Sequence, residues 1–476
     1  MDKKNNMPHT SAENTAIELF GLSHCDVEQI STQFIPNAPA LIHITLAPDY
    51  LKCPRCHYEK PTISRYVDKT IQHSILSTNN CLIHYRARRY KCPICGKTYY
   101  EHNPFVFKND KISYMTVLSI PEDLYEPSKT FSSVARDYHV SATTVQNLFD
   151  GHVDVPKARH LPRVMQIDET YSFKSQNSSY VCMILDYDTQ KAVDLLPTRK
   201  KEDLMKFFRS FPKVEREKVK YIAADMYKTY HEVCKSMFPH AIYAVDRFHV
   251  MQEFMKRYTA VRVRIMKGKE RNSDDYYLLK HQFKLLDLPL KAKDGQKPRG
   301  SRSSKPDNRS LVFDPTAEKI YNSHFKCYLN RYDLRELILS VDPQINEIYD
   351  FRNQMSEFFR STSQEEAPQR LNEIIKQMNA SEIQEMNQFA ETLTRWYPEI
   401  LNSFYIVKSD YETSNKDGTV RRKDYRLNSS TIENRNKIVK MVKNNANGYT
   451  NWRRFRNRVL YVLNKVPYNL EPIERN

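Results

Sequence analysis

Three acidic residues far apart in the sequence have the types and positions needed for metal-dependent chemistry on phosphodiesters. Asp168 and Asp225 each end a short apolar run, and Glu433 begins a Lys-rich segment much further along. Carboxylates of this kind can hold two divalent cations about 3.5 to 4 Å apart, which activate an attacking water or 3′-hydroxyl and stabilise the leaving oxygen. The three acids therefore predict a catalytic site for Mg²⁺ or Mn²⁺.

The elements expected around the first two acids would bring them together. The pattern predicts three strands, a helix, a strand, a helix and a strand over residues 164–168, 180–186, 192–196, 202–211, 219–225, 227–238 and 241–246. This is the order of the ribonuclease-H-like fold, in which the first and fourth strands lie side by side. Asp168 and Asp225 would then be neighbours, and a buried pair of carboxylates needs a cation.

Glu433 has a second interpretation. Ser430 and Glu433 are spaced as a capping box, in which the Glu would only accept a hydrogen bond from a backbone N–H at the helix start. If that interpretation holds, the third acid of the site must be sought among Glu169, Asp186 and Asp246.

Four of the nine cysteines form two close pairs. Each Cys-x-x-Cys pair can aim two thiolates at one tetrahedral ion, and the low cysteine content is unlike a disulfide scaffold. The pairs therefore predict one structural Zn²⁺ site at Cys53, Cys56, Cys92 and Cys95. Segments 63–67 and 84–90 are predicted as strands of a long hairpin between the pairs. Alternative ligands are His57, Cys81, His84 and His102.

Residues 130–149 have the pattern of two short helices joined by a tight turn. Val134, Ala135 and Tyr138 would bury one side of the first helix, and Ser141 would cap the second. The pattern is that of a helix-turn-helix, whose second helix enters the major groove of DNA. An ordinary helical hairpin is the alternative. The side chains expected to face bases or phosphates are Thr143, Thr144, Gln146 and Asn147.

The charge of the chain favours double-stranded DNA as the partner. The sequence has 74 Lys+Arg against 57 Asp+Glu, a formal net charge of +17, and such side chains neutralise phosphates and release counterions. Basic residues on the second hairpin strand and after Glu433 are the expected contacts, with a solvated surface as the alternative. They are Arg86, Arg88, Arg89, Lys437, Lys440, Arg453, Arg454 and Arg456.

The composition also indicates the compartment of the cell in which the chain is expected. Hydrophobic residues make up 40% of it, which predicts folded domains. No apolar run predicts a membrane span, and the first residues lack the apolar stretch of a secretory signal. We expect a protein of the cytoplasm, associated with the nucleoid.

The stretch between Asp225 and Glu433 is too long for a loop inside a compact fold, so an inserted domain is expected. It should contain a basic helix over 251–269, a linker over 290–310, further helices over 321–401 and a returning hairpin over 408–425. The predicted organisation is a leader (1–48), a zinc-binding domain (49–108), a helix-turn-helix domain (109–160), a first catalytic part (161–250), a mostly α-helical insertion (251–426) and a last catalytic part (427–476).

These motifs, in this order, resemble the DDE transposases of bacterial insertion sequences, specifically the ISL-three family. The resemblance rests on the cysteine pairs, the helix-turn-helix, Gln166-Ile167-Asp168-Glu169, Ala224-Asp225-Met226, Asp246-Arg247-Phe248-His249 and Thr431-Ile432-Glu433-Asn434-Arg435-Asn436. It implies an α/β multidomain protein whose acidic triad is Asp168, Asp225 and Glu433. It also implies a supporting role for Asp246 and His249. The polar stretch after Leu290 departs from the family pattern.

The resemblance implies a DDE transposase that binds the terminal inverted repeats of its element and catalyses metal-dependent cleavage and strand transfer. Because two ends must be brought together, a homodimer is expected. One alternative is a non-catalytic, sequence-specific DNA-binding regulator derived from a transposase, against which the three acids argue. Another is a nuclease or resolvase on the same fold, which would not need two N-terminal DNA-binding elements.

Overall fold

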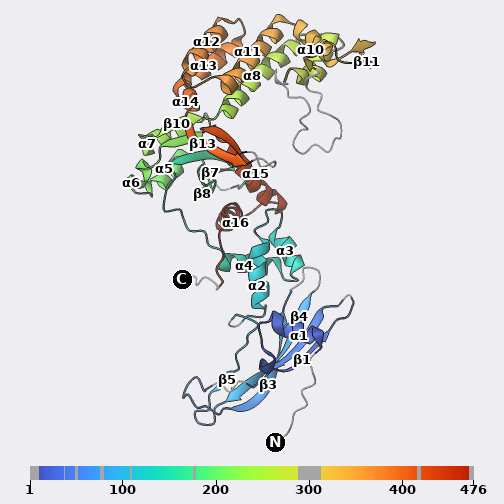
Figure 1. The fold of residues 1–476 in the computed structure, drawn as a ribbon, viewed down its shortest axis with the longest axis vertical. Helices are drawn as coiled ribbons and strands as arrows, with labels where there is room; N and C mark the ends of the chain where they lie inside the picture. The colour runs from blue at the N-terminus through green and yellow to red at the C-terminus, as the bar shows by residue number, and fades with distance from the viewer. Residues whose placement is uncertain are drawn as a thin grey trace.

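The computed structural model describes residues 10–36, 38–48, 52–74, 80–107, 110–174, 178–287, 312–414 and 420–470. The molecule is elongated (Figure 1), with an N-terminal sheet at one end, a bundle of helices at the other and a second sheet between them. No helix among these residues is long and apolar enough to cross a membrane.

The N-terminal sheet contains the predicted hairpin. Its elements are α1 (Ser11–Leu19), β1 (Val27–Gln33), β2 (Ala40–Leu46), β3 (Thr62–Gln72), β4 (Cys81–Lys91) and β5 (Thr98–Tyr100). The strand order is β1-β2-β4-β3, with β5 paired to β4. The hairpin of β3 and β4 is confirmed as an antiparallel pair.

The prediction of a separate leader over 1–48 is not matched by this sheet, because β2 pairs in parallel with β4. Alternate residues of β2, Ile42 and Ile44, are buried with Ile83 and Tyr85 of β4 in one core. A strand places every second side chain on the same face. The apolar face of β2 is therefore covered by the same domain that carries the cysteine pairs.

Three short helices follow, α2 (Tyr114–Asp123), α3 (Phe131–Asp137) and α4 (Ala142–His152). The predicted helix pair is present as α3 and α4, and the Ser141 side chain accepts a hydrogen bond from the backbone N–H of Thr144. Phe131, Val145 and Phe149 form the core between them. Tyr461, from the far end of the chain, completes this core.

The second sheet has the predicted element order, with one additional short helix, α6 (Lys213–Glu217), before the fourth strand. It consists of β6 (Val164–Tyr171), β7 (Tyr180–Asp186), β8 (Ala192–Leu196), β9 (Tyr221–Ala224) and β10 (Ile242–Val245), with helices α5 (Lys201–Arg209), α6 and α7 (Lys228–Met237). The strand order is β10-β9-β6-β7-β8. The sheet is mixed, because β6 pairs antiparallel with β7 and parallel with β9. The expected neighbours, the first and fourth strands, are thus confirmed as partners.

The helices at the upper end of Figure 1 form the inserted region. They are α8 (Arg247–Lys267), α9 (Asp274–Tyr277), a π-helix (Leu278–Gln282), a 3-10 helix (Phe283–Asp287), α10 (Arg331–Ser340), α11 (Pro343–Ser361), α12 (Ala367–Ala380), α13 (Gln384–Arg395) and α14 (Tyr397–Asn402). Two strand pairs accompany them, β11 (Ile320–Asn322) with β12 (Cys327–Leu329) and β13 (Ile406–Ser414) with β14 (Val420–Arg426). The linker predicted over 290–310 lies outside the described residues.

Two C-terminal helices, α15 (Ser430–Asn445) and α16 (Trp452–Asn464), return to the second sheet. Val439 and Val459 pack with Val181 and Met183 of β7, while α5 and α7 lie in the core on the opposite face. The buried Arg458 of α16 donates to backbone carbonyls of the segment between α2 and α3. The last part of the chain therefore joins the second sheet to α2, α3 and α4.

Candidate active site

Asp168 lies at the centre of the second sheet, on β6. Met165 and Ile167 point into the core beneath α5 and α7, so by alternation Asp168 points to the opposite face. Only 7% of Asp168 is exposed. Its Oδ1 accepts a hydrogen bond of 2.7 Å from the backbone N–H of Glu169, and its Oδ2 accepts one of 2.7 Å from the Asn436 amide.

Asp225 follows β9, the strand that pairs in parallel with β6. One oxygen each of Asp168 and Asp225 and one ring nitrogen of His249 all lie within 4.8 Å of one another. The closest contact joins His249 Nε2 to Asp225 Oδ1, at 2.5 Å. The predicted convergence of Asp168 and Asp225 is therefore present, with His249 as a third member.

Asp246 positions His249. The Asp246 carboxylate caps α8 by accepting a hydrogen bond of 2.6 Å from the backbone N–H of Phe248. Its other oxygen accepts a hydrogen bond from the backbone N–H of Ser429. One buried carboxylate thus joins the starts of α8 and α15, and its contacts fit the predicted supporting role.

The charged side chains of this cluster shift one another's pKa values. Burial, followed by the negative charges of Asp225 and Glu169, raises the pKa of Asp168 to about 7. Burial also raises the pKa of Asp225, although the short contact with His249 opposes this rise. For His249, burial alone would lower the pKa, but the contact with Asp225 outweighs it and raises the pKa to about 9. A buried and a half-buried acid at this distance favour a bound cation.

Two atoms of the cluster also fit a metal site. Asp225 Oδ1 and His249 Nε2 are buried and contact each other as a charged pair, although the contact does not have hydrogen-bond geometry. Buried polar atoms without hydrogen bonds are rare and costly. A divalent cation held by Asp168 and Asp225 would also lie within reach of these two atoms.

Glu433 is placed close to the cluster but not inside it. The group within 4.8 Å does not include Glu433. Burial and then the charge of Asp246 raise the pKa of Glu433, and the charge of Asp225 adds to this. The capping-box alternative is not formed, since α15 starts at Ser430 and its N-cap, Ser429, makes no side-chain cap hydrogen bond. The half-buried carboxylate of Glu433 is thus not used to cap the helix.

Two alternative acids are engaged elsewhere. Glu169 is paired with Arg199 and accepts a hydrogen bond of 2.7 Å from the Tyr230 hydroxyl. Asp186 accepts a hydrogen bond of 2.6 Å from the Thr189 hydroxyl in the turn after β7. Both of these acids are therefore engaged by other side chains.

Asn436 is a site residue that the sequence analysis missed. It is buried on the face of α15 that packs on the sheet, together with Ile432 and Val439. A polar residue at the spacing of an apolar helix face is a detectable signal. Glu433 lies three residues earlier, on the neighbouring part of the same face.

The two cysteine pairs converge. Cys53 Sγ lies 3.5 Å from Cys95 Sγ, and Cys56 Sγ lies 3.5 Å from Cys92 Sγ. All four sulfurs lie within 4.8 Å of one another, and this group contains none of the alternative ligands. The arrangement fits four thiolates around one structural Zn²⁺ ion.

The residues expected to bind DNA divide into exposed and internally paired side chains. Arg88 is 1% exposed and is paired with Glu101 and Glu28. The prediction that Arg88 contacts DNA is wrong in this structure, because its buried guanidinium forms ion pairs inside the N-terminal domain. Arg86 is exposed, and Arg89 is half-buried and donates a hydrogen bond to Thr98.

Two C-terminal arginines are corrected in the same way. Arg454 pairs with Asp150 of α4 at 2.8 Å and donates to Gln146. Arg456 pairs with the buried Asp194 at 2.7 Å. Arg454 therefore joins α16 to α4, Arg456 joins α16 to β8, and Gln146 is engaged by Arg454.

The other expected contacts remain accessible to a ligand. Arg453 is 67% exposed, although it lies 3.1 Å from Asp154. Thr144 is half-buried and lies within hydrogen-bond distance of the Ser141 hydroxyl. Exposed side chains are those of Thr143, Asn147, Lys437 and Lys440.

Comparison with known families agrees with this geometry. A family model described as "Transposase", that of the ISL-three DDE transposases, matches residues 165–415, more than half of the chain. The matched segment contains Asp168, Asp225 and His249 and ends before Glu433. No curated protein matches the chain significantly. A DDE domain implies transposition, and the chain belongs to the ISL-three family of DDE transposases.

Proposed function

We propose that this protein is the transposase of an insertion sequence. It binds the terminal inverted repeats, cuts the DNA at the ends of the element and joins the 3′-hydroxyls to target DNA. The observation that carries the proposal is the convergence of Asp168 and Asp225 on adjacent central strands of a mixed sheet. The strand order supports a ribonuclease-H-like fold for this domain.

Asp168, Asp225 and Glu433 would hold the divalent cations. When bound, Mg²⁺ or Mn²⁺ would activate the attacking hydroxyl and stabilise the leaving oxygen. Asn436 fixes the orientation of the Asp168 carboxylate by its hydrogen bond. His249, from α8, holds Asp225 by a charged contact of 2.5 Å. Side chains that orient metal ligands are commonly as important as the ligands themselves.

DNA binding is assigned to the parts that precede and follow the catalytic sheet. α3 and α4 would act as a helix-turn-helix, with Thr143 and Asn147 on the exposed side of the second helix. Arg86 and Arg89 of β4 would contact phosphates near the zinc site, and Lys437 and Lys440 would do so near the metals. Two ends would be brought together by a homodimer.

A regulator without catalytic activity is the second candidate, and the cluster argues against it. A protein that only binds DNA has no need to keep a buried and a half-buried carboxylate side by side, which is costly without a cation. Loss of either Asp would relieve that cost.

The decisive experiment is an Mg²⁺-dependent reaction on a duplex that carries the terminal repeat and its flank. Wild type should cut at the repeat and join the 3′-hydroxyl to a target plasmid. Asp168→Ala, Asp225→Ala and Glu433→Ala should bind the duplex but not cut it, whereas Asp203→Ala, an exposed acid on α5, should react normally. Binding without cutting by wild type would favour the regulator. Cutting without joining, on any sequence, would favour a nuclease.

A further inference from the structure

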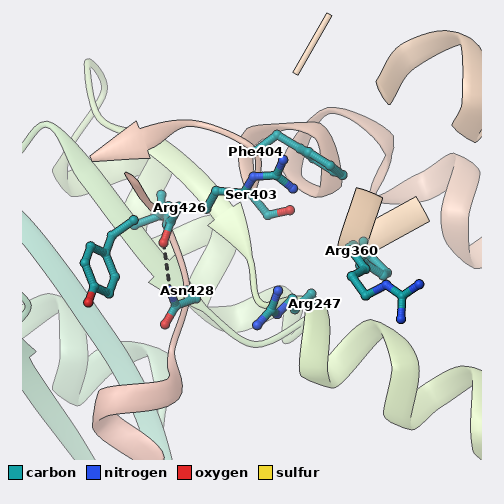
Figure 2. Close-up of a pocket in the computed structure, with 9 residues that line it drawn as sticks. Arg247, Arg360, Ser403, Phe404, Arg426 and Asn428 are labelled. Atoms are coloured by element: carbon teal, nitrogen blue, oxygen red, sulfur yellow. Dashed lines mark hydrogen bonds between the residues drawn. The ribbon is translucent and has the colours of Figure 1, made fainter. Parts of the chain in front are cut away.

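A pocket of about 330 Å³ lies beside the active site, where the inserted helices meet the catalytic sheet. Figure 2 shows its lining. The side chains come from α8, from the end of α11, from the turn after α14 and from the end of β14 with the residues that lead into α15. They include Arg247, Arg360, Phe404, Arg426 and Asn428.

Three arginines from three separate elements line this pocket. Arg247 is the first residue of α8, Arg360 lies near the end of α11, and Arg426 ends β14. No acidic residue is among the lining residues. Among the described residues, no carboxylate forms an ion pair with any of the three. The pocket therefore concentrates positive charge that no carboxylate in the described part of the chain neutralises.

Other arginines of the same domains are neutralised. Arg199 pairs with Glu169, Arg264 with Glu385 and Arg456 with Asp194. Arg426 is instead held by uncharged groups, because it donates a hydrogen bond of 2.8 Å to the carbonyl of Thr362 and its guanidinium lies over the Phe404 ring.

The charged form of Arg426 is also disfavoured by its surroundings. Burial and the positive charge of Arg247 lower the pKa of Arg426. An anion between the two guanidinium groups would offset this repulsion, since a buried or crowded charge is stabilised by an opposite one. Arginine, with its planar fork of donors, is well suited to a phosphate.

The pocket is joined to the catalytic cluster through the chain. Arg247 directly follows Asp246 and lies two residues before His249. On the other side, Asn428 donates a hydrogen bond of 2.7 Å to the carbonyl of Arg426, and the next residue, Ser429, donates to Asp246. An anion in this pocket would therefore lie next to the reacting phosphodiester.

We propose that this pocket binds a backbone phosphate of the DNA strand that runs past the cleavage point. The inference rests on the proposed function. The pocket would fix the position of the strand on the catalytic sheet and would carry no sequence preference, since phosphate contacts position DNA without reading bases. It also assigns a role to the inserted helices, because α11 supplies Arg360.

The test measures binding of the full chain to a fluorescent duplex carrying the terminal repeat and its flank, without added Mg²⁺ and over a range of salt concentrations. Each lost phosphate contact should reduce the slope of log affinity against log salt by about one. We expect this reduction in Arg360→Gln, and a larger one when Arg426→Gln is added. Arg426→Lys keeps the charge and should keep most of the slope.

The matched control is Arg370→Gln, which removes an exposed arginine of α12 outside the pocket and should leave the slope unchanged. A neutral methylphosphonate next to the cleavage point should weaken binding by wild type and not by the double variant. Thermal unfolding checks that the variants fold. If the double variant is unstable, Arg360→Gln alone decides, because that side chain is exposed.

Three outcomes would overturn the proposal, and they are distinguishable. If wild type cuts and joins ends while Arg360→Gln behaves like Arg370→Gln, the pocket does not bind DNA but the proposed function stands. If inorganic phosphate stabilises wild type and not the double variant, with equal salt slopes on DNA, the pocket is a site for free phosphate. If wild type does not bind the duplex at all, the proposed function fails together with the pocket.

Discussion

The side-chain amide of Asn436 donates a hydrogen bond of 2.7 Å to Oδ2 of Asp168, across 268 positions of the sequence. Both side chains are buried. The other carboxylate oxygen of Asp168, Oδ1, accepts a hydrogen bond from the backbone N–H of Glu169. Together the two hydrogen bonds fix the plane of the carboxylate. The helix that provides Asn436 also carries Glu433, so the geometry of the site depends on how α15 packs against β6.

Asn436→Ala should therefore impair catalysis more than it impairs folding. Without the amide, the Asp168 carboxylate can rotate, and loss of a group that orients a metal ligand typically costs about 10- to 100-fold in metal affinity or activity. The measurement is the Mg²⁺ concentration that gives half-maximal cleavage. Asn434→Ala, an exposed neighbour on the same helix, should match wild type. Equal Mg²⁺ requirements in both variants would contradict the assigned role.

Glu433→Gln and Ser430→Ala separate the two interpretations of Glu433. Because no capping box is formed, Ser430→Ala should leave both the unfolding temperature and cleavage nearly unchanged. Glu433→Gln should reduce cleavage by about 100-fold or more, since a metal ligand supplies several kcal/mol to the transition state. A fall in stability of about 1 kcal/mol in both variants, with cleavage retained, would restore the capping interpretation.

Local pattern was sufficient to predict much of the catalytic domain. The apolar runs that end at Asp168 and Asp225 are strands of the sheet, and the order of elements placed these strands side by side. Ser141 and the cysteine pairs were predicted because their functions depend on short spacings. Such signals lie within a few residues of each other.

Partners distant in the sequence could not be predicted in this way. In the sequence, Arg88, Arg454 and Arg456 stand among other basic residues, and nothing nearby marks their acidic partners. Those partners lie on other elements. The pairing of β2 with β4 likewise depends on a parallel register that no local motif specifies. Asn436 had a visible signal, a polar residue on an apolar helix face, but its partner is set by tertiary packing.

The pKa of Asp168 predicts how stability depends on pH when no Mg²⁺ is added. Burial and then the charges of Asp225 and Glu169 raise this pKa to about 7, so the folded chain holds the proton more tightly than the unfolded chain does. The contribution to stability is present at low pH and is lost as the pH rises from about 4 to about 7. Asp168→Asn cannot ionise and should lack this loss.

The measurement is the difference in unfolding temperature between Asp168→Asn and wild type from pH 5 to pH 8. The difference should increase with pH in favour of the variant, by up to a few kcal/mol in unfolding free energy, because one pKa unit corresponds to about 1.4 kcal/mol. Added Mg²⁺ should reduce the difference by stabilising the ionised carboxylate of wild type. A constant difference across this range would show that Asp168 is ionised without cost.

Loss of zinc should unfold the N-terminal domain and leave the catalytic sheet intact. Cys92→Ser removes one of four converging sulfurs, and zinc contributes about 10–16 kcal/mol to the folding of small zinc-finger peptides. Zinc content per chain and the number of thermal transitions are the measurements. Cys81→Ala, at a buried cysteine outside the group, should keep its zinc. Retention of zinc by Cys92→Ser would point to one of the alternative ligands.

Arg86 and Arg88 are two positions apart on β4 and should respond in opposite ways. Arg88 is buried, pairs with Glu101 at 3.2 Å and donates a hydrogen bond of 2.5 Å to the carbonyl of Leu46. Removing it leaves the buried carboxylate of Glu101 without its charged partner, so Arg88→Ala should destabilise the N-terminal domain by about 3–5 kcal/mol. Arg86 is exposed beside Tyr66, so Arg86→Ala should weaken DNA binding and leave stability nearly unchanged.

Thermal unfolding and duplex binding of the two variants check both expectations. Equal losses of stability would mean that Arg86 also belongs to the internal network.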